Sequence, residues 1–390
     1  MKHRRIRPIV AALISVAILA SCSAEEEAPE PERAVHSVNS SLPEVEVEQL
    51  SLPFAFQELP AFTLPFEDIP RSADGILFGL HEVDGVLEFS AVSTDGEVLW
   101  TTERPASCSG FTLSKIGETP IAVLTDVEST DDALAQVTAS AYDLRTGELQ
   151  WGPVPVAGAW QGPGTVFAEA APASAMGETG QRQVLDPASG EPVEIDGHVI
   201  GEFDGTILSA SDAGGEAAIT AEGEQEWEVP LAQLLPEDEG AATDSGVKPL
   251  PGQARPPGFA LLGIDDSPEA ALIDLSNGDV VSPRATSAAW DPAAEMLIFT
   301  EPGTLAGYTP EGPAWNRELA EGLRITASGG VLTYLRSDTA VQVINAVTGE
   351  DAVGYDPEAT SYAIPSLVTA DGAAVFNLDD LTLIGTHEAP

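Results

Sequence analysis

The side chains that could carry covalent or metal chemistry are few in this sequence and lie far apart. Its two cysteines are Cys22 and Cys108, and its five histidines are His3, His36, His81, His198 and His387. The wide spacing of the histidines fits no metal-binding motif with short, fixed offsets. The sequence also lacks a nucleophile elbow, a phosphate-binding loop and a dinucleotide-binding fingerprint. It therefore indicates no catalytic, cofactor-binding or metal-binding residue, and we expect a protein without enzymatic activity.

Carboxylates are so abundant that no acid–base pair stands out. The 390 residues include 63 Asp and Glu against 16 Lys and Arg, which gives a formal net charge of −47. The pairs Asp131-Asp132 and Asp265-Asp266 lack the dense, alternating ligands of a calcium loop. We expect no resident calcium, with weak binding as the alternative. Cys108 has no histidine near it in sequence, so we interpret it as a small buried apolar residue.

The charge excludes two classes of partner. Residues 1–21 carry four of the basic residues and no acid, so the remaining chain has twelve basic residues, 63 acids and a net charge of −51. Such a surface repels nucleic acid and anionic lipid. We therefore expect no nucleic-acid partner. Solubility explains most of this charge, and binding of cations or of a basic partner is the alternative.

The N-terminus has the three parts of a secretion signal in the correct order. Residues 1–8 are basic, residues 9–20 are apolar but too few to span a bilayer, and Ser21-Cys22 follows. The sequence LASC at residues 19–22 resembles the lipobox of bacterial lipoproteins, although an ordinary secretory peptide is the alternative. The resemblance implies cleavage before Cys22 and lipidation of its sulfur, with fatty acids such as palmitate. Two acyl chains would hold the protein stably on the outer face of the cell membrane.

Changes in composition divide the chain into four parts. Residues 1–21 are the expected lipoprotein signal peptide, and residues 22–49 are rich in Glu, Pro and Ser, which predicts a disordered tether. Residues 50–72 contain four prolines, which predict an extended segment along the surface or an edge strand. From residue 73 to residue 390, short apolar runs with a period of two alternate with glycine turns, which predicts antiparallel strands joined by tight turns.

A glycine turn closes each of a series of similar segments, and the following apolar run often ends in Trp. Residues 95–100 read DGEVLW and residues 143–151 read DLRTGELQW. The turn glycines, 33 to 55 residues apart, are Gly96, Gly147, Gly190, Gly223, Gly278, Gly312 and Gly349. A period near forty with several strands per unit is typical of propeller blades. We expect an all-β fold, a single β-propeller of four-stranded antiparallel blades, with eight blades favoured and seven as the alternative.

The strings at residues 95–100 and 143–151 resemble the PQQ-like repeat of quinoprotein-type β-propellers. The resemblance covers roughly residues 73–390 and implies that the glycine turn joins two outer strands while the Trp docks between neighbouring blades. The docking residues implied in this way are Trp100, Trp151, Trp227 and Trp315. No Trp follows Gly190 or Gly278, so we expect weaker docking there. The chain lacks the adjacent cysteines of quinoprotein dehydrogenases, so the resemblance does not extend to a PQQ cofactor.

Two tryptophans and one long stretch lie outside the repeat. Trp160 and Trp290 stand in sequences typical of loops, which makes them candidates for a binding surface, with burial at the start of a blade as the alternative. The stretch from Leu235 to Gly258 is the longest irregular one, and we interpret it as a mobile insertion.

These features together predict a membrane-tethered, extracytoplasmic β-propeller lipoprotein. We expect a monomer that acts as a scaffold by binding an envelope protein or another cell-surface component. The alternative is a small-ligand binding protein, or a quinone-dependent or calcium-dependent enzyme, that uses the mouth of the propeller channel. The fold by itself does not decide between them.

Overall fold

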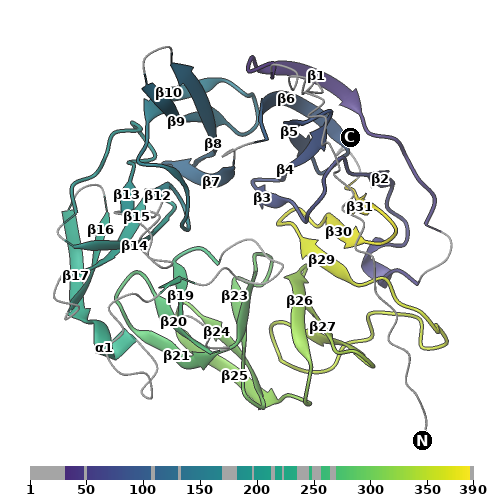
Figure 1. The fold of residues 1–390 in the computed structure, drawn as a ribbon. Helices are drawn as coiled ribbons and strands as arrows, with labels where there is room; N and C mark the ends of the chain where they lie inside the picture. Colours follow the sequence, from purple (N-terminus) through teal and green to yellow (C-terminus); the bar gives the residue numbers. More distant parts are fainter. Residues whose placement is uncertain are drawn as a thin grey trace, which may run out of the picture.

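The computed structural model describes residues 31–47, 51–106, 110–130, 133–168, 182–195, 197–211, 216–221, 224–234, 246–247, 256–263 and 269–386. Within these ranges the chain forms strands and turns, with two short helical turns, η1 (Phe54–Phe56) and α1 (Leu231–Leu234). The sheets stand side by side around a common centre (Figure 1). The glycine-turn repeat therefore predicts the fold class correctly, because this arrangement is an all-β propeller.

The described strands form antiparallel sheets, numbered here in the order in which they follow one another around the ring. Sheet 1 has the order β1-β6-β5-β4-β3, with β1 (His36–Ser41), β3 (Arg71–Ala73), β4 (Ile76–Val83), β5 (Val86–Ser93) and β6 (Glu97–Pro105). Sheet 2 contains β7 (Phe111–Ile116), β8 (Thr119–Thr130), β9 (Ala133–Asp143) and β10 (Leu149–Pro155). Sheet 3 contains β11 (Ala159–Trp160), β12 (Val166–Ala168) and β13 (Arg182–Val184). Sheet 4 contains β14 (His198–Phe203), β15 (Thr206–Ala210), β16 (Glu216–Ala221) and β17 (Glu224–Pro230).

The second half of the chain continues the ring and closes it. Sheet 5 contains β18 (Gly246–Val247), β19 (Phe259–Gly263), β20 (Ala270–Asp274) and β21 (Val280–Ala285). Sheet 6 contains β22 (Ser287–Asp291), β23 (Met296–Glu301), β24 (Thr304–Thr309) and β25 (Gly312–Glu318). Sheet 7 contains β26 (Arg324–Gly329), β27 (Leu332–Arg336) and β28 (Val341–Asn345). Sheet 8 has the order β2-β31-β30-β29, with β2 (Ala61–Thr63), β29 (Pro365–Val368), β30 (Ala374–Asn377) and β31 (Leu381–Ile384).

The hydrophobic core lies between neighbouring sheets. Residues along β6 alternate between buried and half-buried, as the period of two predicts. One face of β6 contributes Trp100 to a cluster that joins sheets 1 and 2 and also contains Phe78 and Leu124. Equivalent clusters fill the other junctions, so each sheet covers the apolar face of the next.

Strands from both ends of the chain share a sheet where the ring closes. In sheet 8, β2 pairs with β31 so that Phe62 lies opposite Leu383 (Figure 1). The strand β2 lies inside the extended segment predicted for residues 50–72 and forms the outer edge of that sheet. The ring is therefore closed by backbone hydrogen bonds between segments about 320 residues apart in sequence.

The predicted disordered tether is wrong for residues 36–41. These residues form β1, which pairs with β6 and adds a fifth strand at the outer edge of sheet 1 (Figure 1). All six residues of β1 are exposed, so their side chains carry no apolar pattern that could have predicted a strand. The strand forms because the free edge of β6 offers unpaired backbone groups.

Several predicted features lie outside the described residues. These are the signal peptide with Cys22, the thiol of Cys108, the turn at Gly223 and most of the stretch from Leu235 to Gly258. In the part of the chain that the structure describes, no helix is long and apolar enough to cross a membrane.

Candidate functional site

Four tryptophans on outer strands contact the next sheet in the same way. Each indole N–H donates a hydrogen bond to a backbone carbonyl of the neighbouring closing turn. The pairs are Trp100 with Leu144 at 2.9 Å, Trp151 with Pro187 at 2.7 Å, Trp227 with Leu275 at 2.8 Å and Trp315 with Ala346 at 2.9 Å. These four side chains therefore join sheets 1 to 2, 2 to 3, 4 to 5 and 6 to 7, and they serve packing between sheets.

The closing turns have a local structure that suits this contact. Asp143 begins one turn, and its carboxylate accepts hydrogen bonds from the N–H groups of Arg145 and Thr146 at 3.0 and 2.7 Å. Gly147 then has a φ of +70°, and a Cβ at this position would lie 2.9 Å from the Trp100 ring. Glycine is required both for the left-handed backbone and for the space that the indole occupies.

An aromatic side chain that the repeat did not reveal docks where the ring closes. Phe62, on β2, lies against Gly96, where a Cβ would come within 2.8 Å of its ring. Phe62 thereby takes the place that Trp has at four other junctions. The repeat could not identify it because Phe62 precedes its sheet in sequence and does not follow a glycine turn.

Ser282 occupies the docking position in sheet 5. It pairs with Leu272 directly beside a β-bulge, as Trp100 pairs with Ala91 and Trp151 with Ala141. Its buried hydroxyl donates a hydrogen bond to the Glu301 carboxylate of sheet 6. A short polar contact therefore replaces a large aromatic one at this junction.

A cleft of about 480 Å³ lies at the junction between sheets 5 and 6. Its lining includes the apolar or aromatic side chains of Val281, Phe299 and Tyr308, and the carboxylates of Asp279 and Glu301. None of the described residues that line it is Lys or Arg. Burial, together with the charges of Asp274 and Asp279, raises the pKa of Tyr308 above its ordinary value, so its hydroxyl stays protonated near neutral pH.

A second hollow of about 650 Å³ lies on the surface near β25 and the turn at residues 349–351. Arg317 and Asp351 line it and form an ion pair with each other at 2.9 Å. That ion pair lowers the pKa of Asp351. One arginine therefore lies among the three carboxylates of this hollow, Glu318, Glu350 and Asp351, whereas no Lys or Arg is among the described residues that line the cleft between sheets 5 and 6.

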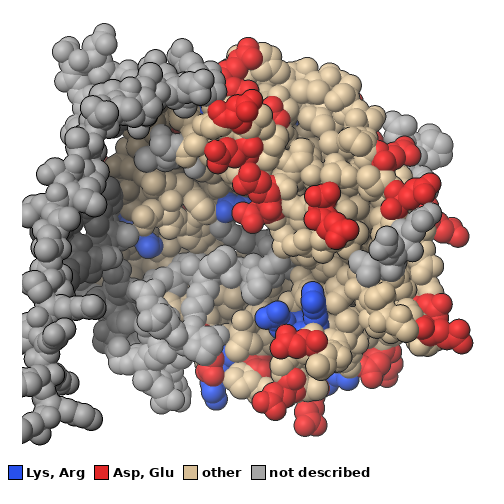
Figure 2. Space-filling model, turned by 45° about the vertical axis from the view of Figure 1, so that its right-hand side comes forward, with Lys and Arg blue, Asp and Glu red and all other residues tan. Residues whose placement is uncertain are grey.

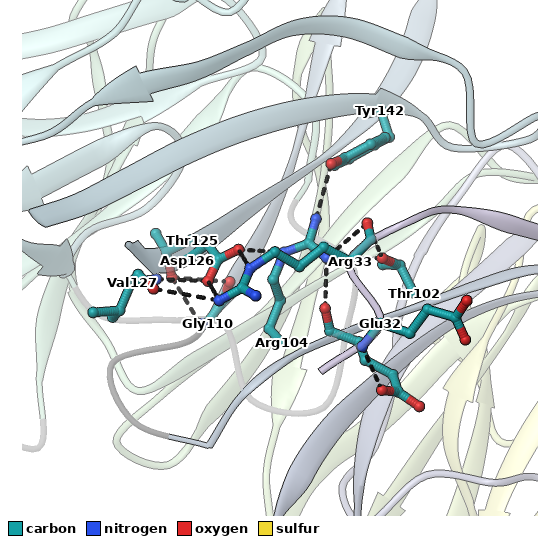
Figure 3. Close-up of polar contacts among 10 residues, drawn as sticks. Glu32, Arg33, Thr102, Arg104, Gly110, Thr125, Asp126, Val127 and Tyr142 are labelled. Atoms are coloured by element: carbon teal, nitrogen blue, oxygen red, sulfur yellow. Dashed lines mark hydrogen bonds and ion pairs between the residues drawn. The ribbon is translucent and has the colours of Figure 1, made fainter. Parts of the chain in front are cut away.

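The N-terminal end of the described chain is anchored to sheets 1 and 2 by a network of arginines (Figure 3). Arg33 forms an ion pair with Asp126 of β8 at 2.6 Å, and its carbonyl accepts hydrogen bonds from Thr102 and Arg104 at 3.1 and 3.3 Å. Arg104 is 3% exposed and donates to the Tyr142 hydroxyl at 2.8 Å. The backbone at residues 32–33 is thus fixed at the rim of the propeller.

The two tryptophans outside the repeat lie on different sheets and are not brought together. Trp160, on β11, is half-buried, donates to the Gly164 carbonyl at 2.8 Å and lies 4.7 Å from the Arg71 guanidinium carbon. Trp290, on β22, is half-buried against the core between sheets 5 and 6. Their expected role in binding stays a prediction.

A fully buried carboxylate, Glu202, joins sheets 2, 3 and 4. It accepts hydrogen bonds from the Ser114 hydroxyl at 3.0 Å and from the N–H groups of Thr165 and Gly205 at 2.9 and 2.6 Å. Burial raises its pKa, and these hydrogen bonds oppose that rise. Nothing in the sequence distinguishes Glu202 from the other acids, because its role depends on three sheets meeting around it. Among the described residues, no group of three or more His, Cys, Asp and Glu side chains is arranged to hold a metal ion.

Comparisons with known proteins show only distant similarity. No protein-family model matches the chain, and no curated protein matches it in sequence. Among solved structures, the quinohemoprotein alcohol dehydrogenase from Comamonas testosteroni has 12% identity and a TM-score of 0.40, and the alignment covers 87% of this chain and 77% of that one. The dihydro-heme d1 dehydrogenase NirN, in complex with DHE, has 12% identity and a TM-score of 0.41, with 83% and 78% covered. Hsv2 from Kluyveromyces lactis has 11% identity and a TM-score of 0.35, and the alignment covers 72% of this chain and 94% of that one. Similarity at this level carries no inference about activity, and the propeller is established by the arrangement of this chain's own sheets.

Proposed function

We propose that the protein is a lipoprotein tethered to the outer face of the cell membrane, and that its propeller is a scaffold that binds an envelope or cell-surface protein. The observation that carries this proposal is the anchorage of residues 32–33 to sheets 1 and 2, directly downstream of the lipobox at residues 19–22 (Figure 3). The proposed lipid and the propeller rim are thereby joined by a short connection.

The length of that connection limits where the propeller can stand. Cys22 and Glu32 are ten positions apart in the sequence, and a fully extended chain spans about 3.4 Å per residue, so the lipidated sulfur would lie within about 34 Å of the anchorage. The scaffold would therefore stay close to the membrane, with the rim of sheets 1 and 2 toward it. A partner would approach from the membrane plane or from the opposite side of the ring.

The surface charge supports a tethered protein that does not lie on the lipid itself. Acidic side chains are spread over the face shown in Figure 2, whereas basic ones are confined to a few places. Such a surface is repelled by anionic lipid headgroups and attracts basic surfaces of proteins. The lipid supplies attachment, and the acidic propeller remains free to bind a partner.

Substitution of Cys22 tests the tether. We expect Cys22→Ala to move the protein from the membrane fraction to the soluble fraction, because two acyl chains provide the attachment. Cys108→Ala is the matched control and should stay with the membrane. A Cys22→Ala protein that remains in the membrane fraction would contradict the proposal.

Crosslinking on intact cells tests the scaffold role. We expect one discrete protein partner to be captured with the tethered protein and to be lost or reduced with Cys22→Ala, because the tether raises the local concentration. The alternative, a ligand-binding protein or a quinone-dependent or calcium-dependent enzyme, predicts no such partner. It predicts instead quinone absorbance in the purified protein, or a melting temperature that rises with the ligand.

A further inference from the structure

We infer that the cleft between sheets 5 and 6 is a binding site for an organic cation. The ligand class is an alkylammonium or alkylguanidinium group, the chemistry shared by Lys and Arg side chains and by free organic amines. The inference requires neither the lipid tether nor a scaffold partner, and it can be tested on the purified protein.

The cleft lies beside the docking position of sheet 5, because the buried Ser282 hydroxyl bonds Glu301, which lines the cleft. Four outer strands carry Trp at this position, and each indole fills the space beside the next sheet. In sheet 5 this position holds the small side chain of Ser282, and the neighbouring cleft between β21 and sheet 6 has a volume of about 480 Å³, which is within the range of ligand pockets. The core beneath is intact, because Phe299 and Leu272 belong to one buried cluster.

Aromatic and apolar groups form one part of the lining. Tyr308 is held edge-on against Phe259 of β19, with ring centroids 6.3 Å apart. Val281 and Phe299 lie beside it in the lining. A cation above an aromatic face is attracted by the quadrupole of the ring, and the alkyl part of a Lys or Arg side chain packs well on such a surface.

Carboxylates form the other part, and none of the described lining residues is a Lys or Arg that could balance them. Asp279 and Glu301 line the cleft, and Ser282 holds the Glu301 carboxylate in place. The nearest arginine along β25, Arg317, points toward sheet 7, where it bonds the Gly349 carbonyl at 2.7 Å and Asp351 at 2.9 Å. A bound cation would therefore supply the missing positive charge.

Calorimetric titration of the purified full-length protein tests this site. The probes are N-acetyl-arginine methylamide and its uncharged isostere, N-acetyl-citrulline methylamide. We expect the arginine compound to bind at least about tenfold more tightly, with an affinity that falls as salt is added. Equal binding of the two probes, or binding of neither, would overturn the inference.

Three variants locate the site. Ser282→Trp should abolish binding, because the indole would displace the Glu301 carboxylate that Ser282 holds in the lining, while the melting temperature of the variant shows that the protein is folded. Glu301→Gln should weaken binding by about tenfold through loss of one carboxylate. Glu318→Gln removes the same charge from the same sheet outside the cleft and should bind as the unchanged protein does. Undiminished binding by a folded Ser282→Trp protein would place the site elsewhere and overturn the inference.

A free amine distinguishes the source of the cation. Butylguanidinium carries the charged group and an alkyl chain but no peptide backbone. Tighter binding of the arginine amide supports the site as one for a peptide side chain, whereas tighter binding of butylguanidinium supports it as one for a small free cation. Failure of both compounds would overturn the cation site without affecting the proposed tether.

Discussion

At the junction between sheets 1 and 2 the outer strand presents Trp100, whereas the equivalent position at the junction between sheets 5 and 6 is Ser282. Trp100 is fully buried and bonds the next turn, and Val35 packs against the same cluster from outside. Arg104 joins the same two sheets and holds the N-terminal segment. Ser282 donates to Glu301 and accepts a hydrogen bond from the Arg284 N–H at 3.2 Å, and a cleft lies beside it.

This difference shows how one repeat produces both a closed and an open junction. In both sheets the docking residue pairs directly beside a β-bulge, and the pairing of β20 with β21 has a second irregularity on the other side of Ser282. The docking side chain is buried in both sheets, as a large indole at one junction and as a small hydroxyl beside a cleft at the other. In a propeller, a functional surface can therefore arise where a repeat departs from its own pattern, without any change of fold.

The largest effect is expected from removal of the aromatic side chain at the closed junction. Trp100→Ala should lower the free energy of unfolding by about 3–5 kcal/mol, because it leaves a buried cavity. Trp100→Phe should lower the free energy of unfolding by less, because it keeps an aromatic ring in the space and loses only part of the buried area and the hydrogen bond to the Leu144 carbonyl. Urea unfolding monitored by circular dichroism measures both, and a loss below about 1 kcal/mol for Trp100→Ala would show that this contact is not needed for closure.

A smaller effect is expected where a turn glycine faces a docked indole. Gly190→Ala should lower the free energy of unfolding by about 2 kcal/mol, because the new Cβ would lie 2.5 Å from Trp151 and the backbone φ is +72°. Gly303→Ala is the matched control, since its φ of +77° is similar and no atom lies within 4 Å of its Cβ. The difference between the two, measured by urea unfolding, isolates the steric effect, and equal losses would mean that the indole moves aside freely.

At the open junction the expected changes in stability are modest. Ser282→Ala removes the donor to Glu301 and the acceptor of the Arg284 N–H, and it should lower the free energy of unfolding by about 1–2 kcal/mol. Ser282→Trp loses the same bond but gains buried aromatic area, so its unfolding free energy should exceed that of Ser282→Ala. Thermal unfolding of the two variants side by side checks this order. A Trp variant less stable than the Ala variant would mean that the cleft cannot accept an indole.

The smallest expected effect is a dependence of stability on pH. It arises from Glu202, which lies where sheets 2, 3 and 4 meet. Its folded-state pKa is raised by burial, so the folded protein keeps a proton at pH values where the unfolded chain has released it. Stability from this group is therefore present below the unfolded pKa of about 4.5 and is lost as the pH rises through the folded pKa. Glu202→Gln should remove this loss, so the stability of the variant relative to the unchanged protein should improve from pH 4.5 toward neutrality. Urea unfolding of both proteins across that pH range measures the difference between their free energies of unfolding. A difference that does not change with pH would contradict the raised pKa.

The sequence predicted those parts of the structure that depend on local pattern. Period-two strands, glycine turns and recurring Trp identified the propeller, because backbone conformation and alternation are properties of neighbouring residues. The strand β1 and the docking residue Phe62 were missed, because each acquires its role from a sheet edge that the sequence does not display beside it. The absence of Trp after Gly278 was visible in the sequence, but the cleft was not.

The sequence by itself determined the all-β repeat, the acidic surface and the positions of the docking tryptophans along the chain. Only the tertiary structure decided which residues face one another across a junction. It brought Arg33 to Asp126, enclosed Glu202 among three sheets and set Tyr308 beside Asp279 and Glu301 in one cleft. The physical reason is that a repeat specifies each sheet separately, whereas the contents of a junction depend on pairs of side chains that meet only when the ring closes.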